Sequence, residues 1–193
     1  MRGVSQMSFI KRAFDVVFSL ISLVVLIIPF VIIGIVSLIV QGKPVFISQK
    51  RYGKNGKAFD IYKFRTMKTG APVFASNDVD EKYITKWGSL LRKTSGDELP
   101  QLVNVLKGDM SLVGPRPLIL EEDEIHQLRL KNGIYSVRPG ITGWAQVNGR
   151  DDVSIDEKVK LDRYYVENLS VFFDIKIIFK SFSAVLLERN IKK

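Results

Sequence analysis

The N-terminal part of the chain is dominated by one long apolar run. No charged residue lies between Asp15 and Lys43, and Val16–Val40 is built of aliphatic and aromatic side chains with only Ser, Gly and Pro between them. The run is longer than the ~20 residues that a helix needs to cross a bilayer. It is too long for the apolar core of a signal peptide, and no small-residue cleavage motif follows it, so we expect it to be retained.

Two features favour a broken helix over a straight membrane span. Pro29 lies near the middle of the run, where a proline removes one helical hydrogen bond and clashes with the preceding turn. Lys and Arg residues flank the run on both sides, and under the positive-inside rule both flanks prefer the cytoplasm. A helix broken at Pro29 keeps both basic flanks at the cytoplasmic face by dipping into the membrane and returning. Each arm of such a helix is about 18–20 Å long. A kinked transmembrane helix and a buried helix of a soluble protein are the alternatives.

The remainder of the chain alternates short apolar runs with polar turns. The pattern predicts a β-hairpin of Val45–Gln49 and Phe59–Phe64 and helices over Asp80–Lys93, Asp97–Lys107, Glu121–Leu130 and Asp156–Asn168. Gly108 is expected to end its helix in a left-handed conformation. The Gly-rich stretch Arg138–Arg150 is predicted to be irregular.

A last helix is predicted near the C-terminus. Apolar side chains recur there at helical spacing, namely Val171, Ile175, Ile178, Phe182 and Val185, joined by Phe172, Phe179 and Leu186. Lys176, Lys180 and Ser183 fall largely outside this stripe. Such a helix suits the membrane interface, and an amphipathic helix that packs on a core gives the same pattern.

Together these elements predict an α+β fold that is mostly helical. We expect a single compact basic domain with a β-hairpin on a membrane anchor, whose apolar helix, broken or kinked at Pro29, either dips into the membrane and returns or crosses it. The predicted division is 1–43 for the membrane segment and 44–193 for the cytoplasmic domain, which ends in the amphipathic helix.

Composition narrows the chemistry. The chain has 193 residues with 29 Lys and Arg against 20 Asp and Glu, a net charge of +9, one His and no Cys. Without cysteine there is no disulfide, thiolate metal site or cysteine nucleophile, and a lone histidine makes a zinc pair unattainable. The positive charge indicates an anionic partner: nucleic acid, a phosphorylated ligand or an anionic membrane face. His126, among charged residues of a predicted helix, is expected at the surface.

Asp97 and Glu98 are the candidate catalytic residues. If Asp97 is the N-cap of the following helix, the pair lies at the positive end of the helix dipole, which favours ionised carboxylates. An ionised Asp there can attack phosphorus or hold Mg²⁺, and a neighbouring carboxylate can take up a proton. The same residues also fit ordinary capping, because Ser95 and Glu98 match the S-x-x-E capping box.

Several cations stand in settings that suit phosphate binding. Pro115 and Pro117 fix the backbone around Arg116, which reduces the entropy lost when a guanidinium clamps a phosphate. A rigid turn with a solvated arginine is the alternative. The other candidates for substrate binding are Lys63 and Arg65 at the end of the hairpin, and Arg138 and Arg150 beside flexible glycines.

These segments closely resemble the bacterial polyprenyl-phosphate sugar phosphotransferases, the monotopic phosphoglycosyl transferases of capsule, exopolysaccharide and glycoprotein assembly. The resemblance covers residues 9–187. It rests on the segments Lys11–Asp15, Tyr62–Met67, Asp97–Pro117, Arg138–Arg150 and Asp162–Tyr165. One departure is Ile28 before Pro29, where the family often has Ser-Pro, so the break relies here on Ser19, Ser22 or packing.

The resemblance implies a re-entrant membrane helix and an enzyme at the cytoplasmic face of the bacterial inner membrane. Sugar-1-phosphate would pass from a UDP-sugar, expected to be an N-acetylated amino sugar, to polyprenyl (undecaprenyl) phosphate. Asp97 would attack the sugar-bearing phosphorus, expel UMP and hold a covalent phosphosugar, with Glu98 handling a proton. Mg²⁺ is the implied cofactor, with Asp97 as a ligand.

The expected partners are the UDP-sugar, polyprenyl phosphate and membrane lipid, with no nucleic acid. The resemblance is compatible with a homodimer. A non-enzymatic basic membrane adaptor that binds acidic lipids is the alternative from another class, and a lipid phosphatase is a second enzymatic one. The adaptor explains the charge and the apolar segment but gives no reason for Asp97-Glu98 beside a proline-fixed Arg116.

Overall fold

The helices and the hairpin that the sequence pattern predicts are present, with differences at several of their ends. A computed structural model describes residues 2–72, 80–149 and 154–186. In these ranges the chain is mostly helical, as predicted, with an antiparallel β-hairpin and a second small sheet that the sequence did not predict. Arg150 lies outside the described residues.

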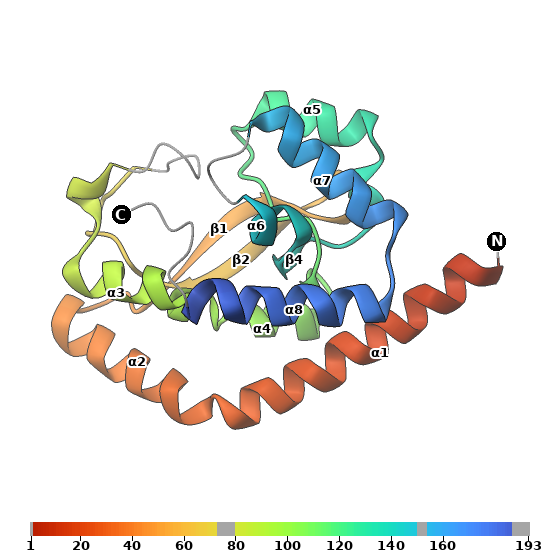
Figure 1. The fold of residues 1–193 in the computed structure, drawn as a ribbon. Coiled ribbons are helices and arrows are strands. Elements are labelled where there is room, and N and C mark those ends of the chain that lie inside the picture. The colour runs from red at the N-terminus through yellow and green to blue at the C-terminus, as the bar shows by residue number, and fades with distance from the viewer. Residues whose placement is uncertain (1, 73–79, 150–153, 187–193) are drawn as a thin grey trace.

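The apolar run forms two helices that lie beneath the rest of the molecule as a wide V (Figure 1). Helix α1 spans Arg2–Val25 and helix α2 spans Ile27–Gln41. The helices meet at Leu26, one turn before Pro29, so Pro29 lies in the first turn of α2, where its missing N–H leaves no helical hydrogen bond unmade. Among the described residues no single helix is long and apolar enough to cross a membrane, but Phe9–Val25 and Ile27–Gln41, bent by 62°, reach that length and composition as a pair.

The predicted hairpin is confirmed and packs on α2. Strands β1 (Phe46–Tyr52) and β2 (Ala58–Phe64) pair antiparallel, with Phe46 opposite Phe64. The rings of Phe30, Phe46 and Phe64 form one aromatic cluster, with centroids 4.9–5.9 Å apart. This cluster holds the second arm of the V against the hairpin.

Two predicted helices begin later than expected. The region 80–93 contains a 3₁₀ turn, Glu81–Tyr83, followed by α3 (Lys86–Thr94), because Thr85 Oγ1 caps α3 by accepting a hydrogen bond from Gly88 N. Helix α4 spans Gln101–Lys107 and ends, as predicted, at Gly108 in the left-handed region, with φ 93°.

The Gly-rich stretch after Arg138 is more regular than predicted. It contains β4 (Gly140–Thr142), which pairs parallel with β3 (Ser111–Val113), and the short helix α6 (Trp144–Asn148). The two strands approach so closely that a Cβ on Gly140 would lie 2.1 Å from Gly114 N. Only glycine fits at that contact, and a Cβ on Gly143 would likewise lie 2.2 Å from Gly114 O, so these two glycines serve close packing rather than flexibility.

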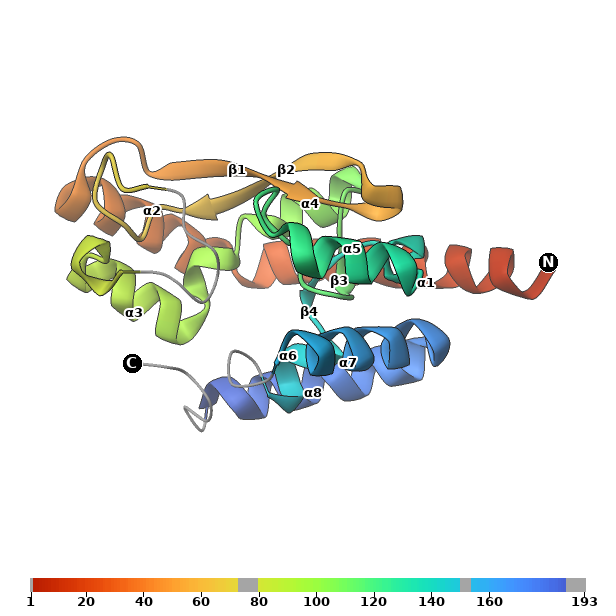
Figure 2. The ribbon, with the colours of Figure 1, turned by 90° about the horizontal axis from the view of Figure 1, so that it is seen from above.

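The last helices complete the fold. Helices α5 (Asp123–Lys131) and α7 (Ile155–Glu167) lie side by side in both views (Figures 1 and 2). Helix α8 (Val171–Leu186) is confirmed; it buries Asp174 and Ile177 but leaves Phe172, Phe179 and Phe182 exposed. The exposed side of α8 therefore combines these phenylalanines with Lys176 and Lys180, and no described element covers the phenylalanines.

The prediction that His126 lies at the surface is wrong. The side chain is buried, its ring stacks on Tyr52 at 3.7 Å between centroids, and its Nδ1 lies 3.0 Å from the Tyr135 hydroxyl. Tyr52 is distant in the sequence and Tyr135 lies nine residues on, beyond the end of α5, so the charged neighbours of His126 within α5 gave no sign of this packing.

A buried ionic cluster, here called the Lys11 cluster, fastens α1 to α8. Lys11 Nζ lies 2.6 Å from Asp174 Oδ2 and 3.8 Å from Asp15 Oδ1. Asp15 Oδ1 accepts hydrogen bonds from Ser111 Oγ and Leu112 N, and Asp174 Oδ1 accepts one from the Tyr165 hydroxyl. The first arm of the V is thus fixed to the domain by a buried ionic cluster, whereas the second is held by aromatic rings together with hydrogen bonds.

Candidate active site

Asp97 and Glu98 lie in a tight 3₁₀ turn, Gly96–Glu98, between α3 and α4. Ser95 ends α3 in the left-handed region, with φ 55°, and makes no side-chain capping bond. Pro100, which has no N–H, is the N-cap of α4. The predicted cap at Asp97 and the capping box of Ser95 and Glu98 are therefore wrong, because the 3₁₀ turn separates both carboxylates from the helix start.

Two of the predicted cations reach the carboxylate pair, forming what we call the Lys63 cluster. Lys63, near the end of β2, places Nζ 2.9 Å from Glu98 Oε1 and 3.8 Å from Asp97 Oδ2. Arg116, in the loop after β3, directs both terminal nitrogens at Glu98 Oε1, each at 3.3 Å. The Arg116 side chain remains 42% exposed, against 14% for Glu98, so its guanidinium can still meet a ligand.

The two carboxyl groups differ in their electrostatics. Burial raises the pKa of Asp97 above its ordinary value, with the Glu98 charge adding to the rise and Lys63 opposing it. Burial would also raise the pKa of Glu98, but the charges and hydrogen bonds of Lys63 and Arg116 outweigh it and lower that pKa to about 2. Glu98 is firmly ionised, while Asp97 is a poorly solvated and more basic carboxylate.

The Asp97 carboxylate is the less engaged of the two. The described residues give it no hydrogen bond, and its nearest ion-pair partner is Lys63 at 3.8 Å. Glu98, in contrast, accepts hydrogen bonds from both Lys63 and Arg116. Asp97 is thus the group that can approach a substrate without first breaking a protein contact.

Two arginines near the site were not singled out from the sequence. Arg92, in the last turn of α3, acts electrostatically on Asp97 and donates from Nε to Thr66 Oγ1 at 3.1 Å. Arg51, in β1, lies close enough to Arg116 that burial and the Arg116 charge lower its pKa to about 10. Both lie in ordinary basic contexts along the chain, and only the packing of β1 and α3 around the turn brings them to the site.

Two other predicted cations are not brought to the carboxylates. The Arg65 guanidinium is buried at the end of α2, where Nη2 donates to the carbonyls of Gln41 and Gly42. Arg138 Nε donates to the carbonyl of Gly108, at the end of α4, at 2.7 Å. Both bind the free carbonyl groups at helix C-termini, which attract cations.

The turn with the carboxylates lies directly against the apolar V. A Cβ on Gly96 would lie 3.4 Å from Ile33 Cδ1 of α2. Nearby, Trp87 Nε1 of α3 donates to Ser37 Oγ of α2 at 2.9 Å. The turn that carries the carboxylates and helix α3 therefore both pack directly on α2.

The residues fit Mg²⁺ only as an ion shared with substrate. The described part of the chain contains no group of three or more His, Cys, Asp or Glu side chains that could hold a metal. Glu98 is occupied by Lys63 and Arg116, which leaves Asp97 as the available carboxylate. Mg²⁺ is commonly bound by one or two carboxylates together with substrate phosphates and water, so a single free carboxylate is a sufficient protein contribution.

Comparison with known proteins places the chain in a family. The family described as bacterial sugar transferase matches residues 6–188. The uncharacterized sugar transferase EpsL of Bacillus subtilis is 47% identical over 79% of this chain and 75% of that protein. The exopolysaccharide production protein ExoY of Sinorhizobium fredii is 39% identical over 93% of this chain and 87% of its own length. The UDP-glucose:undecaprenyl-phosphate glucose-1-phosphate transferase of Escherichia coli is 38% identical, and 39% of its length is covered.

A cation-lined carboxylate pair beside an apolar bent helix suits an enzyme that handles anionic substrates at a lipid surface. The chain belongs to the bacterial sugar transferase family, and it is a transferase. The predicted resemblance to polyprenyl-phosphate sugar phosphotransferases is thereby confirmed.

Proposed function

We propose that the protein transfers sugar-1-phosphate from a UDP-sugar to polyprenyl phosphate, with Asp97 as the nucleophile. The observation that carries this is the Asp97 carboxylate: buried, raised in pKa, free of hydrogen bonds from described residues and surrounded by cations. A poorly solvated carboxylate is a better nucleophile, and the cations offset its repulsion from a diphosphate.

In the first step an Asp97 oxygen attacks the sugar-bearing phosphorus of the donor. The new bond joins that oxygen to phosphorus, the bridging P–O bond breaks, and UMP leaves with its electron pair. In the second step an oxygen of polyprenyl phosphate attacks the same phosphorus and releases Asp97 as a carboxylate. A covalent intermediate lets two different anionic substrates use one site in turn.

Lys63 and Arg116 bind the phosphates of the donor. Both now contact Glu98, and Arg116 is partly exposed, so a diphosphate can replace part of their contact with Glu98. While both cations hold it, Glu98 is too weak a base to take a proton, with a pKa of about 2. Glu98 accepts the proton of the lipid phosphate only after the cations have turned to the substrate. Mg²⁺ held by Asp97 would neutralise further diphosphate charge.

The membrane arrangement supports a lipid acceptor. The V of α1 and α2 dips into the cytoplasmic face of the inner membrane and returns, and the exposed Phe side of α8 lies in the interface. Because Gly96 lies against Ile33, the site is at the level where a lipid phosphate would emerge. A continuous helix would lose one hydrogen bond at Pro29 and clash with the turn before it, so Pro29 favours a break at Leu26, where neither cost arises.

UMP release from a panel of UDP-sugars tests the function. Release that requires polyprenyl phosphate for multiple turnover supports the transferase, and the panel sets the sugar, which we propose is an N-acetylated amino sugar. Glucose and galactose belong in the panel because relatives are named for them. If no donor yields UMP, the protein is better explained as a lipid-binding adaptor. If inorganic phosphate is released from the lipid instead, it is better explained as a phosphatase.

A further inference from the structure

The loop that carries Arg116 is held at four successive carbonyl groups by donors from other parts of the chain. The carbonyl of Pro115 accepts from Gly140 N at 3.0 Å, that of Arg116 from Arg129 Nη1 at 2.7 Å, that of Pro117 from Arg51 Nη1 at 3.4 Å and that of Leu118 from Tyr52 N at 2.9 Å. Two of these residues are prolines without an N–H, so their carbonyl groups are the polar contacts that fix the loop backbone.

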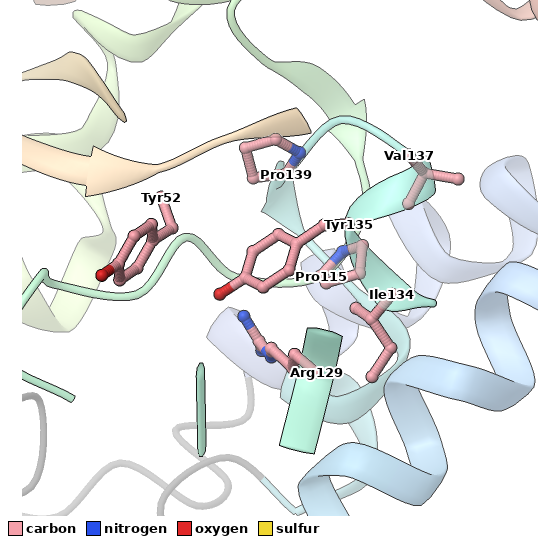
Figure 3. A pocket seen from close by; sticks show the side chains of 7 residues that line it. All are labelled: Tyr52, Pro115, Arg129, Ile134, Tyr135, Val137 and Pro139. Carbon is pink, nitrogen blue, oxygen red and sulfur yellow. The ribbon is translucent and has the colours of Figure 1, made fainter. Parts of the chain in front are cut away.

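The donor to the Arg116 carbonyl is itself fixed. Arg129, on α5, is buried, and its Nη2 lies 2.5 Å from Asp162 Oδ2 of α7. Figure 3 shows the Arg129 side chain directed toward the Tyr135 hydroxyl, beside Pro115. The side chains of Arg129 and Asp162 are 4% and 2% exposed, so neither can reach a substrate.

A contribution to stability alone does not explain the buried ion pair of Arg129 and Asp162. A buried ion pair loses much of its Coulomb energy to desolvation, and apolar side chains of similar size often do as well. A guanidinium, in contrast, can bind a carboxylate through one nitrogen and a carbonyl through another, in one rigid plane. Arg129 does this, joining α7 to the backbone of Arg116.

We propose that Arg129, aligned by Asp162, is a positioning residue that holds the Arg116 backbone so that its guanidinium faces the donor diphosphate. The inference rests on the proposed function, because it assumes that Arg116 binds the donor. It also gives Asp162, buried and 2.5 Å from Arg129, a role at a site that it does not touch.

A double-mutant cycle tests this inference. Arg129→Lys keeps the charge beside Asp162 but cannot bridge both acceptors as a rigid fork. Loss of positioning should raise the KM for the UDP-sugar about tenfold with kcat less affected, because a displaced Arg116 weakens donor binding. In an Arg116→Ala background the same change should alter KM less than about twofold. Arg163→Lys, next to Asp162 but paired with Glu167 at the surface, is the matched control.

The outcomes separate positioning from simple stability. Equal effects of Arg129→Lys in both backgrounds, or a loss of activity that follows only the melting temperature, would overturn the proposal. If Arg129→Lys does not fold, Asp162→Asn replaces it in the cycle with the same expectations. If Arg116→Ala leaves KM unchanged, the inference fails, while UMP release by the otherwise intact Asp97 site shows separately that the proposed function stands.

Discussion

The described part of the chain contains two buried clusters of one lysine with two carboxylates, and the clusters differ in how many hydrogen bonds their carboxylates accept. In the Lys11 cluster, Asp15 and Asp174 accept hydrogen bonds from a hydroxyl, a backbone N–H and a tyrosine besides facing the lysine. In the Lys63 cluster, Glu98 is well held, but Asp97 has only the ion pair at 3.8 Å from the described residues.

The difference separates a structural from a chemical use of the same groups. The Lys11 cluster, whose carboxylates accept hydrogen bonds from the fold itself, fixes α1 to α8. A buried carboxylate without hydrogen-bond donors has a raised free energy in its charged form. A reaction in which the same oxygen loses its charge by forming a bond is favoured by this amount. The number of unsatisfied carboxylate positions is therefore a better guide to the reactive residue than charge alone.

Asp97→Asn should have the largest effect. Removing the nucleophile is expected to lower turnover by about a thousandfold or more, while the protein stays folded, since a carboxylate whose pKa is raised by burial is destabilising at neutral pH. UMP release measures the loss of turnover, and thermal unfolding in detergent shows whether the protein stays folded. Turnover near that of the unchanged protein would rule Asp97 out as nucleophile.

Lys11→Met should lower stability and leave activity nearly unchanged, the opposite of the result expected for Asp97→Asn. It leaves Asp15 and Asp174 buried without their cation, which is expected to cost about 3–5 kcal/mol of stability. The activity per folded molecule should change little. Denaturant midpoints compared with the exposed-lysine control Lys57→Met measure the effect, and an unaltered midpoint would show that the Lys11 cluster is not structural.

Removal of divalent metal should stop turnover without unfolding the protein. A chelator is expected to reduce UMP release by about a hundredfold, and added Mg²⁺ to restore it, because metal charge offsets the repulsion between Asp97 and the diphosphate. The unfolding temperature should not move, since the Lys11 cluster fastens the fold through protein groups alone. Transfer that continues at full rate in chelator would contradict the metal assignment.

The pH dependence of stability should show the smallest effect. The pKa of Glu98 is lowered from 4.5 to about 2, so its ion pairs stabilise the fold fully above pH 4.5, and this contribution is lost as the pH falls toward 2. Glu98→Gln should flatten the midpoint curve in that window. Glu167→Gln, in a surface pair with Arg163, is the control; equal curves for both variants would refute the shift at Glu98.

Much of this fold is accessible from local patterns, and the exceptions have physical causes. The hairpin, α7, α8 and the end of α4 at Gly108 follow from periodicity and turn residues. The start of α4 cannot be predicted in this way, because the sequence of a 3₁₀ turn followed by a proline N-cap also matches the S-x-x-E pattern of a capping box. The burial of His126 depends on Tyr52 and Tyr135, which only tertiary packing brings to it.

The site shows the same division. The carboxylate pair, Lys63 and Arg116 were proposed from the sequence, and the structure brings these four side chains together. Arg65 and Arg138 are chemically equal candidates along the chain, but helix-end carbonyls bind them elsewhere. Which cation meets a carboxylate and which meets a carbonyl depends on helix ends far away in the sequence.

The most direct test of the central claim is the intact mass of the protein after incubation with its UDP-sugar in the absence of polyprenyl phosphate. The account predicts one phosphosugar added to Asp97, released UMP in equal amount, and loss of the adduct when polyprenyl phosphate is supplied. UMP release without any adduct, or an equal adduct on Asp97→Asn, would contradict it.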